Sequence, residues 1–287
     1  MIQLNKNTSR KDNLIFDVGL HKGEDTEFYL KKGFEVIAFE ADPDLIEENK
    51  KKFSVEIIEK KLIIIEGAIV EDPSTQKVKF YKNLDKTTWG TVNQSWASRN
   101  EKLGTQNKLI EVNTIDFSKC IETYGIPYYI KIDIEGADLV CLKAFRQFKL
   151  KPYYLSIESE KVVFEKLIQE LEILIDLGYD KFTTVQQVNM KDTKVPNPPM
   201  EGDFVSHIFS QGSSGLFGKD LQENWMGKDD ILKEYDKIFS NYKKYGDSTF
   251  WQQNIFAKSL LRIISTMIGK PIPGWYDTHA KHSSCDN

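Results

Sequence analysis

Short apolar runs alternate with amphipathic segments over the first 180 residues or so of the chain. The runs are rich in isoleucine, valine and aromatic residues, and they cover residues 14–16, 36–39, 62–65, 128–132 and 153–157. The clearest amphipathic segment, residues 161–177, places its apolar side chains on one stripe of a helix. Strands that alternate with helices in this way predict a parallel sheet that is covered on both faces.

Two further pairs of segments carry the pattern of strands. Residues 77–81 and 109–113 alternate apolar and polar side chains, which predicts a hairpin-like pair inside an insertion at about 70–112. Residues 181–188 and 204–209 predict the last two strands, an antiparallel pair at the sheet edge. The predicted fold class is therefore α/β, with a seven-stranded, mostly parallel sheet, an antiparallel edge pair and helices on both faces.

The two ends of the chain differ from this central domain, which we assign to residues 13–212. Residues 1–12 are polar and predict a flexible arm. Residues 213–287 predict a mainly helical extension, with helices over 231–245 and 252–268. The second helix has an apolar stripe. We favour its packing on the domain or on a second copy of the chain, and a membrane surface is the alternative.

Composition and charge narrow the classes of function. The chain has 287 residues, of which 40% are hydrophobic and 29% are charged, as is typical of a soluble globular protein. Its net charge is −4 with no evident basic face, so nucleic acid is not an expected partner. No apolar run is long enough to span a bilayer, and the first twelve residues lack the apolar core of a signal peptide. The three cysteines, Cys120, Cys141 and Cys285, are widely spaced. We therefore expect a cytoplasmic protein without a transmembrane segment.

Residues 14–40 form the most informative unit: a strand, a glycine loop, a helix and a second strand that ends in an acid. Gly19 and Gly23 bracket the loop, and Glu40 closes the second strand. Glycines let a ligand approach the backbone, a helix N-terminus offers free N–H groups, and an acid in this place binds ribose hydroxyls. The unit therefore predicts a nucleoside site.

The acids around the loop indicate which nucleoside is bound. A dinucleotide site uses G-x-G-x-x-G to hold a pyrophosphate, whereas the spacing here is G-x-x-x-G. Glu24 and Asp25 in the first helical turn would repel a pyrophosphate, and Asp17 adds a third negative group. Such surroundings suit a ligand with an ammonium and a sulfonium group, which predicts S-adenosylmethionine.

Five segments together carry a resemblance to a known family. They are DVGLHKGEDTEFYLKKG from residue 17, FEADP at 39–43, WGTVNQSWASRNEKLG at 89–104, YYIKIDIEGAD at 128–138 and SSGLFGKDLQENW at 213–225. In this order they resemble the FkbM-type branch of the class I S-adenosylmethionine-dependent methyltransferases. The resemblance implies a Rossmann-like methyltransferase fold that usually methylates hydroxyl groups of sugars or natural products.

The predicted cofactor-binding residues follow the ends of the first strands. They are Asp17, Gly19, His21, Gly23, Glu40, Ala41, Asp42, Gly67, Ala68 and Asp133. Glu40 is expected to take the ribose hydroxyls, and the small Ala68 leaves room for the adenine.

The predicted catalytic residues are Asp133, Lys131, Glu158 and His21. Asp133 is the first candidate for the base or acceptor-binding group, because the resemblance places IKIDIEGAD next to the reaction centre; capping of the following helix is its alternative role. Lys131 needs a carboxylate partner, which Asp133 or Glu158 would provide. His21 suits proton transfer, a contact to the cofactor carboxylate, or bracing of the loop. The histidines show no metal-ligand spacing, so we predict no metal site; a divalent ion held by Asp133 and Glu158 is the alternative.

The insertion should overhang the crevice, and its predicted substrate-binding residues are Trp89, Asn93, Trp96 and Arg99. Tryptophan stacks on the apolar faces of sugar rings, while asparagine and arginine bind hydroxyl groups. A local cluster that holds the insertion down is the alternative.

The predicted function is O-methylation of a hydroxyl on a carbohydrate or another polar small molecule. Three alternatives stay open: N-methylation of a sugar amine or amino-acid-like substrate, a protein that binds S-adenosylmethionine without turnover, and an NAD enzyme. The C-terminal helices also offer a surface for a homo-oligomer.

Overall fold

The computed structural model describes residues 6–159, 163–188, 190–210, 212–246, 249–268, 272 and 276–286. The strands in these ranges are β1 Arg10–Val18, β2 Glu35–Glu40, β3 Leu62–Glu66, β4 Ala68–Ile69, β5 Lys77–Asn83, β6 Asn107–Ile115, β7 Ile126–Ile132, β8 Tyr154–Glu158, β9 Tyr179–Gln186 and β10 Tyr276–His282. The α-helices are α1 Glu24–Lys31, α2 Pro43–Lys52, α3 Ser54–Ile58, α4 Gln94–Lys102, α5 Phe117–Tyr124, α6 Asp138–Ala144, α7 Phe164–Asp176, α8 Lys228–Tyr245, α9 Phe250–Gln253 and α10 Ile255–Ile268.

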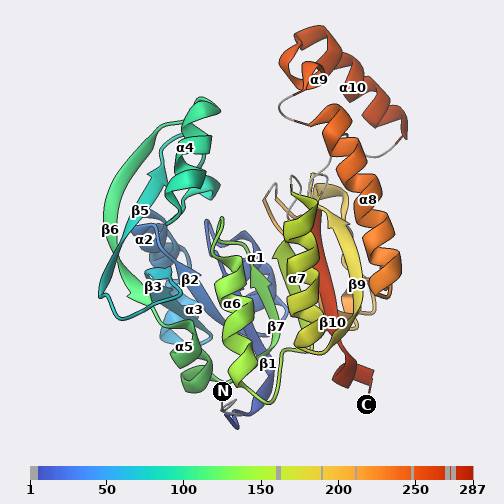
Figure 1. The fold of residues 1–287 in the computed structure, drawn as a ribbon. Coiled ribbons are helices and arrows are strands. Elements are labelled where there is room, and N and C mark those ends of the chain that lie inside the picture. Colours follow the sequence, from blue (N-terminus) through green and yellow to red (C-terminus); the bar gives the residue numbers. More distant parts are fainter. Residues whose placement is uncertain are drawn as a thin grey trace.

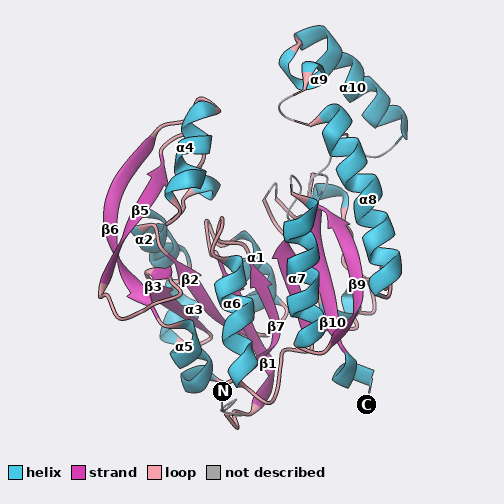
Figure 2. Ribbon diagram, in the orientation of Figure 1, coloured by secondary structure: helices cyan, strands magenta, loops and turns pink. Residues whose placement is uncertain are grey.

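A seven-stranded sheet forms the centre of the molecule, in the order β3-β2-β1-β7-β8-β10-β9. Neighbours from β3 to β8 are parallel, and β10 runs antiparallel to both β8 and β9. Helices cover both faces of this sheet (Figures 1 and 2). The predicted class I methyltransferase fold is thereby confirmed: a mostly parallel sheet with antiparallel strands at one edge.

One strand of the edge pair was predicted in the wrong place. Residues 204–209 form no strand, and β10, from the segment predicted to be mainly helical, lies between β8 and β9 instead. This strand contains the buried polar residues Asp277, Thr278 and His279, so its sequence does not show the apolar run of a central strand. The N-terminal boundary also moves, because β1 begins at Arg10, inside the segment predicted to be an arm.

The two faces of the sheet carry two apolar clusters. On one face, side chains of α5, α6 and α7 pack against alternate residues of β1 and β7, such as Phe16 and Ile130. On the other face, Phe28 and Tyr29 of α1 pack with Phe217 from the segment before α8. The strand positions that face these clusters are almost fully buried, which explains their continuous apolar sequence.

The insertion forms a small sheet of its own, β4-β6-β5, and carries α4. The antiparallel pairing of β5 with β6 confirms the predicted hairpin-like pair. In Figure 1 this insertion stands beside the carboxyl edge of the central sheet. The chain continues on the other side into α8, which packs along β9 and leads to α9 and α10. None of the helices that the structure describes combines the length and the apolar character needed to cross a bilayer.

Candidate functional site

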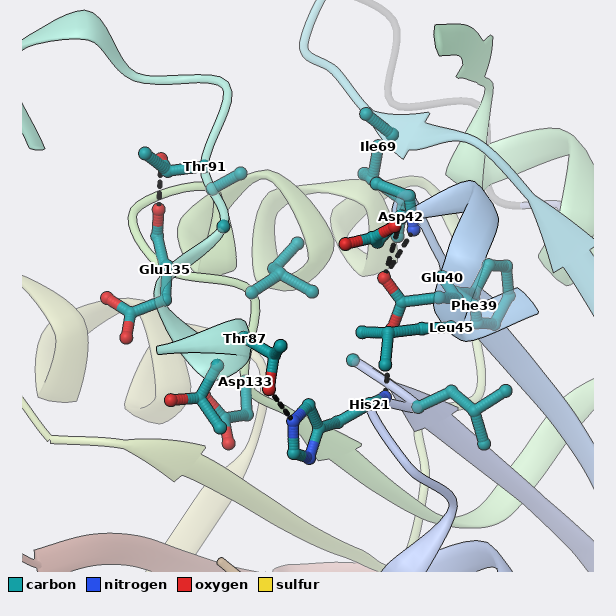
Figure 3. A pocket seen from close by; sticks show the side chains of 18 of the residues that line it. His21, Phe39, Glu40, Asp42, Leu45, Ile69, Thr87, Thr91, Asp133 and Glu135 are labelled. Atoms are coloured by element: carbon teal, nitrogen blue, oxygen red, sulfur yellow. Dashed lines mark hydrogen bonds between the residues drawn. The ribbon is translucent and has the colours of Figure 1, made fainter. Parts of the chain in front are cut away.

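A cavity that is open to solvent lies at the carboxyl ends of β1, β2, β3 and β7. The glycine loop, the insertion and the segment after β7 form its walls (Figure 3). Most of the predicted cofactor and catalytic residues line it: Gly19, His21, Glu40, Ala41, Asp42, Gly67, Ala68, Lys131 and Asp133. The structure thus brings together residues that are more than 100 positions apart in the sequence, as expected for the edge of a parallel sheet.

The cavity has an apolar part and an acidic part. The apolar part is lined by Phe39, Leu45, Ala68, Ile69 and Phe80. The acidic part is lined by Glu24, Asp25, Asp133 and Glu135. Two further acids of the lining, Glu40 and Asp42, lie beside the apolar part (Figure 3). An apolar slot beside several carboxylates fits a nucleoside that carries a cationic side chain, and it fits a pyrophosphate poorly.

Glu40 joins the end of β2 to the glycine loop. Its Oε1 accepts hydrogen bonds from the backbone N–H groups of Ala41 and Asp42, each at 2.8 Å, and its Oε2 accepts one from the N–H of His21 at 2.8 Å. Burial raises the pKa of this carboxyl, against the lowering effect of the three N–H groups. A carboxylate offers about four acceptor positions, so Glu40 retains room for one more donor.

Close packing requires both glycines of the loop. A Cβ on Gly19 would lie 2.0 Å from the carbonyl oxygen of Asp133, and its φ is +99°. Gly19 is therefore required by the close passage of the segment after β7. Gly23 precedes α1 with φ +71°, and a Cβ there would lie 2.4 Å from the ring of Phe53. Of the two, only Gly19 lines the cavity.

His21 connects the glycine loop to the insertion. Its Nδ1 lies 3.1 Å from Glu24 Oε1, and its Nε2 lies 2.7 Å from Thr87 Oγ1 (Figure 3). Although burial raises the pKa of Glu24, the contact with His21 outweighs it and the pKa is lowered overall. Both ring nitrogens are thus hydrogen-bonded, and His21 links the glycine loop to the insertion, which agrees with the predicted role of bracing the loop.

Two more contacts hold the insertion over the cavity. Lys82 Nζ lies 2.8 Å from Asp42 Oδ1, and Thr91 Oγ1 donates to the carbonyl oxygen of Glu135 at 2.7 Å. Together with the contact between His21 and Thr87, they join the insertion to the ends of three strands. The insertion wall of the cavity therefore has a defined position.

Lys131 lies beneath the cavity in a buried group of charges. Its Nζ is 3.4 Å from Asp17 Oδ1, 3.3 Å from Asp25 Oδ2 and 3.9 Å from Asp133 Oδ2. Burial lowers the pKa of Lys131, but the charges of Asp17 and Asp25 outweigh it, and the pKa is raised well above its usual value. Lys131 is therefore a fixed cation and not a proton acceptor. The predicted ion pair of Lys131 with Asp133 is present at 3.9 Å, and in the described part of the chain Lys131 forms none with Glu158.

Of the two buried acids Asp17 and Asp25, only Asp25 lines the cavity. Asp17 is fully buried, accepts a hydrogen bond from Thr26 Oγ1 at 2.6 Å and does not line the cavity, so the predicted contact of Asp17 with the ligand is corrected. Asp25 does line it, and also accepts the N–H of Ser214 at 2.9 Å. Burial raises the pKa of Asp25 to about 7.

Asp133 presents the open carboxylate of the site. Its side chain is 42% exposed, lines the cavity, and has no hydrogen bond from any residue that the structure describes. It does not cap α6, because Asp138 accepts the N–H groups of Ile134 and Gly136 in this segment. The alternative role of Asp133 as a helix cap is therefore excluded.

Asp133 begins a row of acids that the sequence revealed only in part. Ile132 pairs with Ile157, and Glu158 pairs with Asp277, so the three acids lie at one level on adjacent strands. Asp277 is 7% exposed, and burial, followed by the charges of Asp133 and Glu158, raises its pKa well above the usual range. Its position depends on the pairing of β10, for which the local sequence holds no signal. Neither Glu158 nor Asp277 lines the cavity itself.

The predicted substrate residues of the insertion do not line the cavity. Trp89 packs under Lys86 Nζ, which lies 3.6 Å from the ring centroid, and Asn93 caps α4 by accepting the N–H of Ser95 at 2.9 Å. Trp96 lies against Gly136, with Arg99 beside its ring. The insertion lines the cavity instead with Phe80, Thr87, Thr88, Gly90, Thr91 and Val92. In the described part of the chain, no group of His, Cys, Asp and Glu side chains is arranged to hold a metal ion.

Comparison with known proteins agrees with the geometry. Residues 17–181, more than half of the chain, match the family described as Methyltransferase FkbM domain. The comparison with curated proteins gave no match.

Three solved structures are similar at low identity. Methyltransferase FkbM from Methylobacillus flagellatus KT is 18% identical, with 58% of this chain and 38% of that chain covered and a TM-score of 0.36. A SAM-dependent methyltransferase from Archaeoglobus fulgidus is 11% identical, with 94% and 86% covered and a TM-score of 0.37. Precorrin-6y C5,15-methyltransferase from Geobacter metallireducens GS-15 is 12% identical, with 65% and 73% covered and a TM-score of 0.33. The family assignment therefore rests on the sequence match over residues 17–181.

Proposed function

The chain belongs to the FkbM family of S-adenosylmethionine-dependent methyltransferases, and we propose that it methylates a hydroxyl group on a carbohydrate or another polar small molecule. The observation that carries this proposal is the open carboxylate of Asp133, which faces the cavity without a hydrogen bond from the described residues. A hydroxyl group is a weak nucleophile at neutral pH and needs such an acceptor for its proton.

The residues around the apolar slot are suited to hold the cofactor. We assign the adenine to the slot near Ala68 and Ile69, and the ribose hydroxyls to the remaining acceptor position of Glu40. Asp25 at the acidic end provides a counter-charge for the ammonium group. When bound, S-adenosylmethionine supplies a methyl group that its sulfonium already activates.

Asp133 accepts the proton of the acceptor hydroxyl in this scheme. General-base assistance of this kind contributes about 10²–10⁴-fold to a rate. Lys131 Nζ lies 3.9 Å from this carboxylate and places a positive charge beneath it. His21 keeps the insertion in place through Thr87 and takes no part in proton transfer.

The acceptor lies against the insertion wall. Thr87 and Thr88 line the cavity there with exposed side chains, and hydroxyl groups of this kind hydrogen-bond to a polyhydroxyl compound. Of the four residues first predicted for this role, Trp96 lies against Gly136 in the segment after β7.

The test is transfer of labelled methyl from S-adenosylmethionine to a panel of neutral sugars, amino sugars and polyols, with Asp133→Asn beside the native protein. The variant should lose about 10²–10⁴-fold in turnover while its affinity for S-adenosylhomocysteine stays within about threefold. Asp180→Asn, at an exposed position of β9, is the matched control and should turn over normally. Normal turnover by Asp133→Asn would remove this residue as the base.

A second acceptor class is favoured by one specific observation. Asp133 and Glu158 place two carboxyl groups at one level at the end of the sheet, and negative charge there suits an amine-bearing acceptor such as a sugar amine. In the same panel, label in amino sugars but not in neutral sugars would assign the enzyme to N-methylation. Fragmentation of the product by mass spectrometry locates the added methyl group on nitrogen or oxygen.

A further inference from the structure

The segment α9–α10 carries a row of apolar side chains that the rest of the described chain leaves uncovered. Phe256 and Met267 are 83% and 81% exposed, and Leu260 and Ile263 between them are 48% and 58% exposed. These four residues recur at the spacing of one helix face. We call them the α10 stripe. Ala257 and Leu261, on the adjoining face, are buried, and α10 packs against α9, so the stripe lies on the uncovered side of α10.

Charge in this part of the chain has one sign. Between Asp247 and Asp277 the sequence contains no acidic residue and three basic ones, Lys258, Arg262 and Lys270. The net charge of the whole chain is −4, so the remainder carries −7. The basic side chains of α10 that the structure describes, at 258 and 262, are exposed.

We propose that α9–α10 docks on an anionic lipid surface and inserts the α10 stripe between the headgroups. Amphipathic helices that bind membranes in this way combine large apolar side chains with basic ones and carry few acids. Phe250, also exposed, and Trp251 in α9 add aromatic rings of the kind that settle at the interface between lipid and water. A 14-residue helix is about 21 Å long, which suits a position along the surface and falls short of the roughly 30 Å hydrocarbon core.

A second copy of the chain is a less suitable occupant of this face. A two-fold contact through the stripe would bring together two segments that both carry only positive charge. An anionic bilayer offers the opposite charge and a deformable apolar layer at once.

Docking through α9–α10 would also affect the position of the site relative to the membrane. Figure 1 shows α9 and α10 beyond the carboxyl edge of the central sheet, at the same end of the molecule as the insertion with α4. The cavity also opens at this edge. Docking through the stripe would therefore hold the opening of the cavity near the lipid surface.

The experiment is co-sedimentation of the full chain with vesicles of phosphatidylcholine containing 30% phosphatidylglycerol, compared with phosphatidylcholine alone. The test variant is Phe256→Glu combined with Met267→Glu. The control is Ile58→Glu combined with Ile208→Glu. These side chains are as exposed as those of Phe256 and Met267, at 81% and 82%, and lie outside α9–α10. A third variant, Lys258→Glu combined with Arg262→Glu, reverses the charge of α10.

The native protein and the control should bind the anionic vesicles at least tenfold more strongly than the neutral ones, and binding should weaken at high salt. Both α10 variants, the one in the stripe and the one with reversed charge, should bind the anionic vesicles at least tenfold more weakly than the native protein. They should still bind S-adenosylhomocysteine normally, which shows that they are folded. Absence of native binding to anionic vesicles, or equal binding by the stripe variant and the control, would overturn the proposal. Light scattering that shows a dimer in the native protein and a monomer in the stripe variant would assign this face to a second copy instead.

Discussion

Glu40 is the residue whose role can be tested most sharply. Its carboxylate accepts three backbone N–H groups, at 2.8 Å each, which leaves about one acceptor position for a ribose hydroxyl. We expect Glu40→Gln to bind S-adenosylhomocysteine more weakly for two reasons. The amide removes the charged acceptor of the ribose hydroxyl, and its NH₂ group meets the N–H of His21 as donor against donor.

The two effects are separated by ligands that lack a hydroxyl. A hydrogen bond to a charged group is worth about 1.5–3 kcal/mol, so the native protein should bind the 2′-deoxy or 3′-deoxy analogue of S-adenosylhomocysteine about 10- to 150-fold more weakly than the parent. In Glu40→Gln the hydroxyl has lost its partner, and the ratio of the two dissociation constants should fall to within about threefold. The disturbance of the His21 loop affects parent and analogue equally and cancels in this ratio.

Isothermal titration calorimetry measures all the affinities, and thermal unfolding shows whether the variants are folded. Glu66→Gln is the matched control, because Glu66 pairs with Glu40 in the register of β2 and β3 but its side chain is exposed. It should discriminate between the ligands as the native protein does. If Glu40→Gln also kept the native ratio, the ribose contact would be assigned to the wrong residue.

Three predictions concern the support of the site. Burial raises the pKa of Asp25 from 3.8 to about 7, so its stabilising contribution is present below about pH 4 and lost as pH rises to 7. Asp25→Asn should therefore remove about 4 kcal/mol from the pH dependence of the free energy of unfolding, and unchanged pH profiles would contradict this. Lys131→Met leaves two buried carboxylates without their cation and should lower the free energy of unfolding in urea by about 3–5 kcal/mol, whereas Lys61→Met, at an exposed ion pair, should change it by less than about 1 kcal/mol. Gly19→Ala places a Cβ 2.0 Å from a backbone carbonyl oxygen and should cost more than about 2 kcal/mol. Gly104→Ala, at a φ of +90° in open space, isolates the cost of the backbone conformation, about 1–2 kcal/mol, and an equal loss in both variants would refute the steric argument.

Much of the fold could be predicted because its signals are local. The buried parallel strands are continuous apolar runs, and the helix ends carry their own caps: Asp42 accepts the N–H of Asp44 ahead of α2, and Asp116 that of Lys119 at the start of α5. The carboxyl edge of a parallel sheet then brings Glu40 and Asp133 to one cavity by topology alone.

The remainder depends on contacts between distant segments. β10 pairs with β8 and β9 across about a hundred residues, and its buried polar side chains hide the pattern of a central strand. For the same reason the sequence predicts only Asp133 and Glu158 of the three acids in the row, because Asp277 comes beside Glu158 only through this pairing. On the insertion, the sequence indicated the correct segment but not which side faces the cavity. That is decided by the contacts of Thr87 and Thr91 with other loops, so threonines line the wall in place of tryptophans.

A crystal structure of the chain with S-adenosylhomocysteine tests the central claim most directly. The account predicts the ribose hydroxyls on Glu40, the adenine beside Ala68 and the sulfur atom facing Asp133. Density for the ligand at any other place, or in this cavity with its sulfur turned away from Asp133, would contradict it.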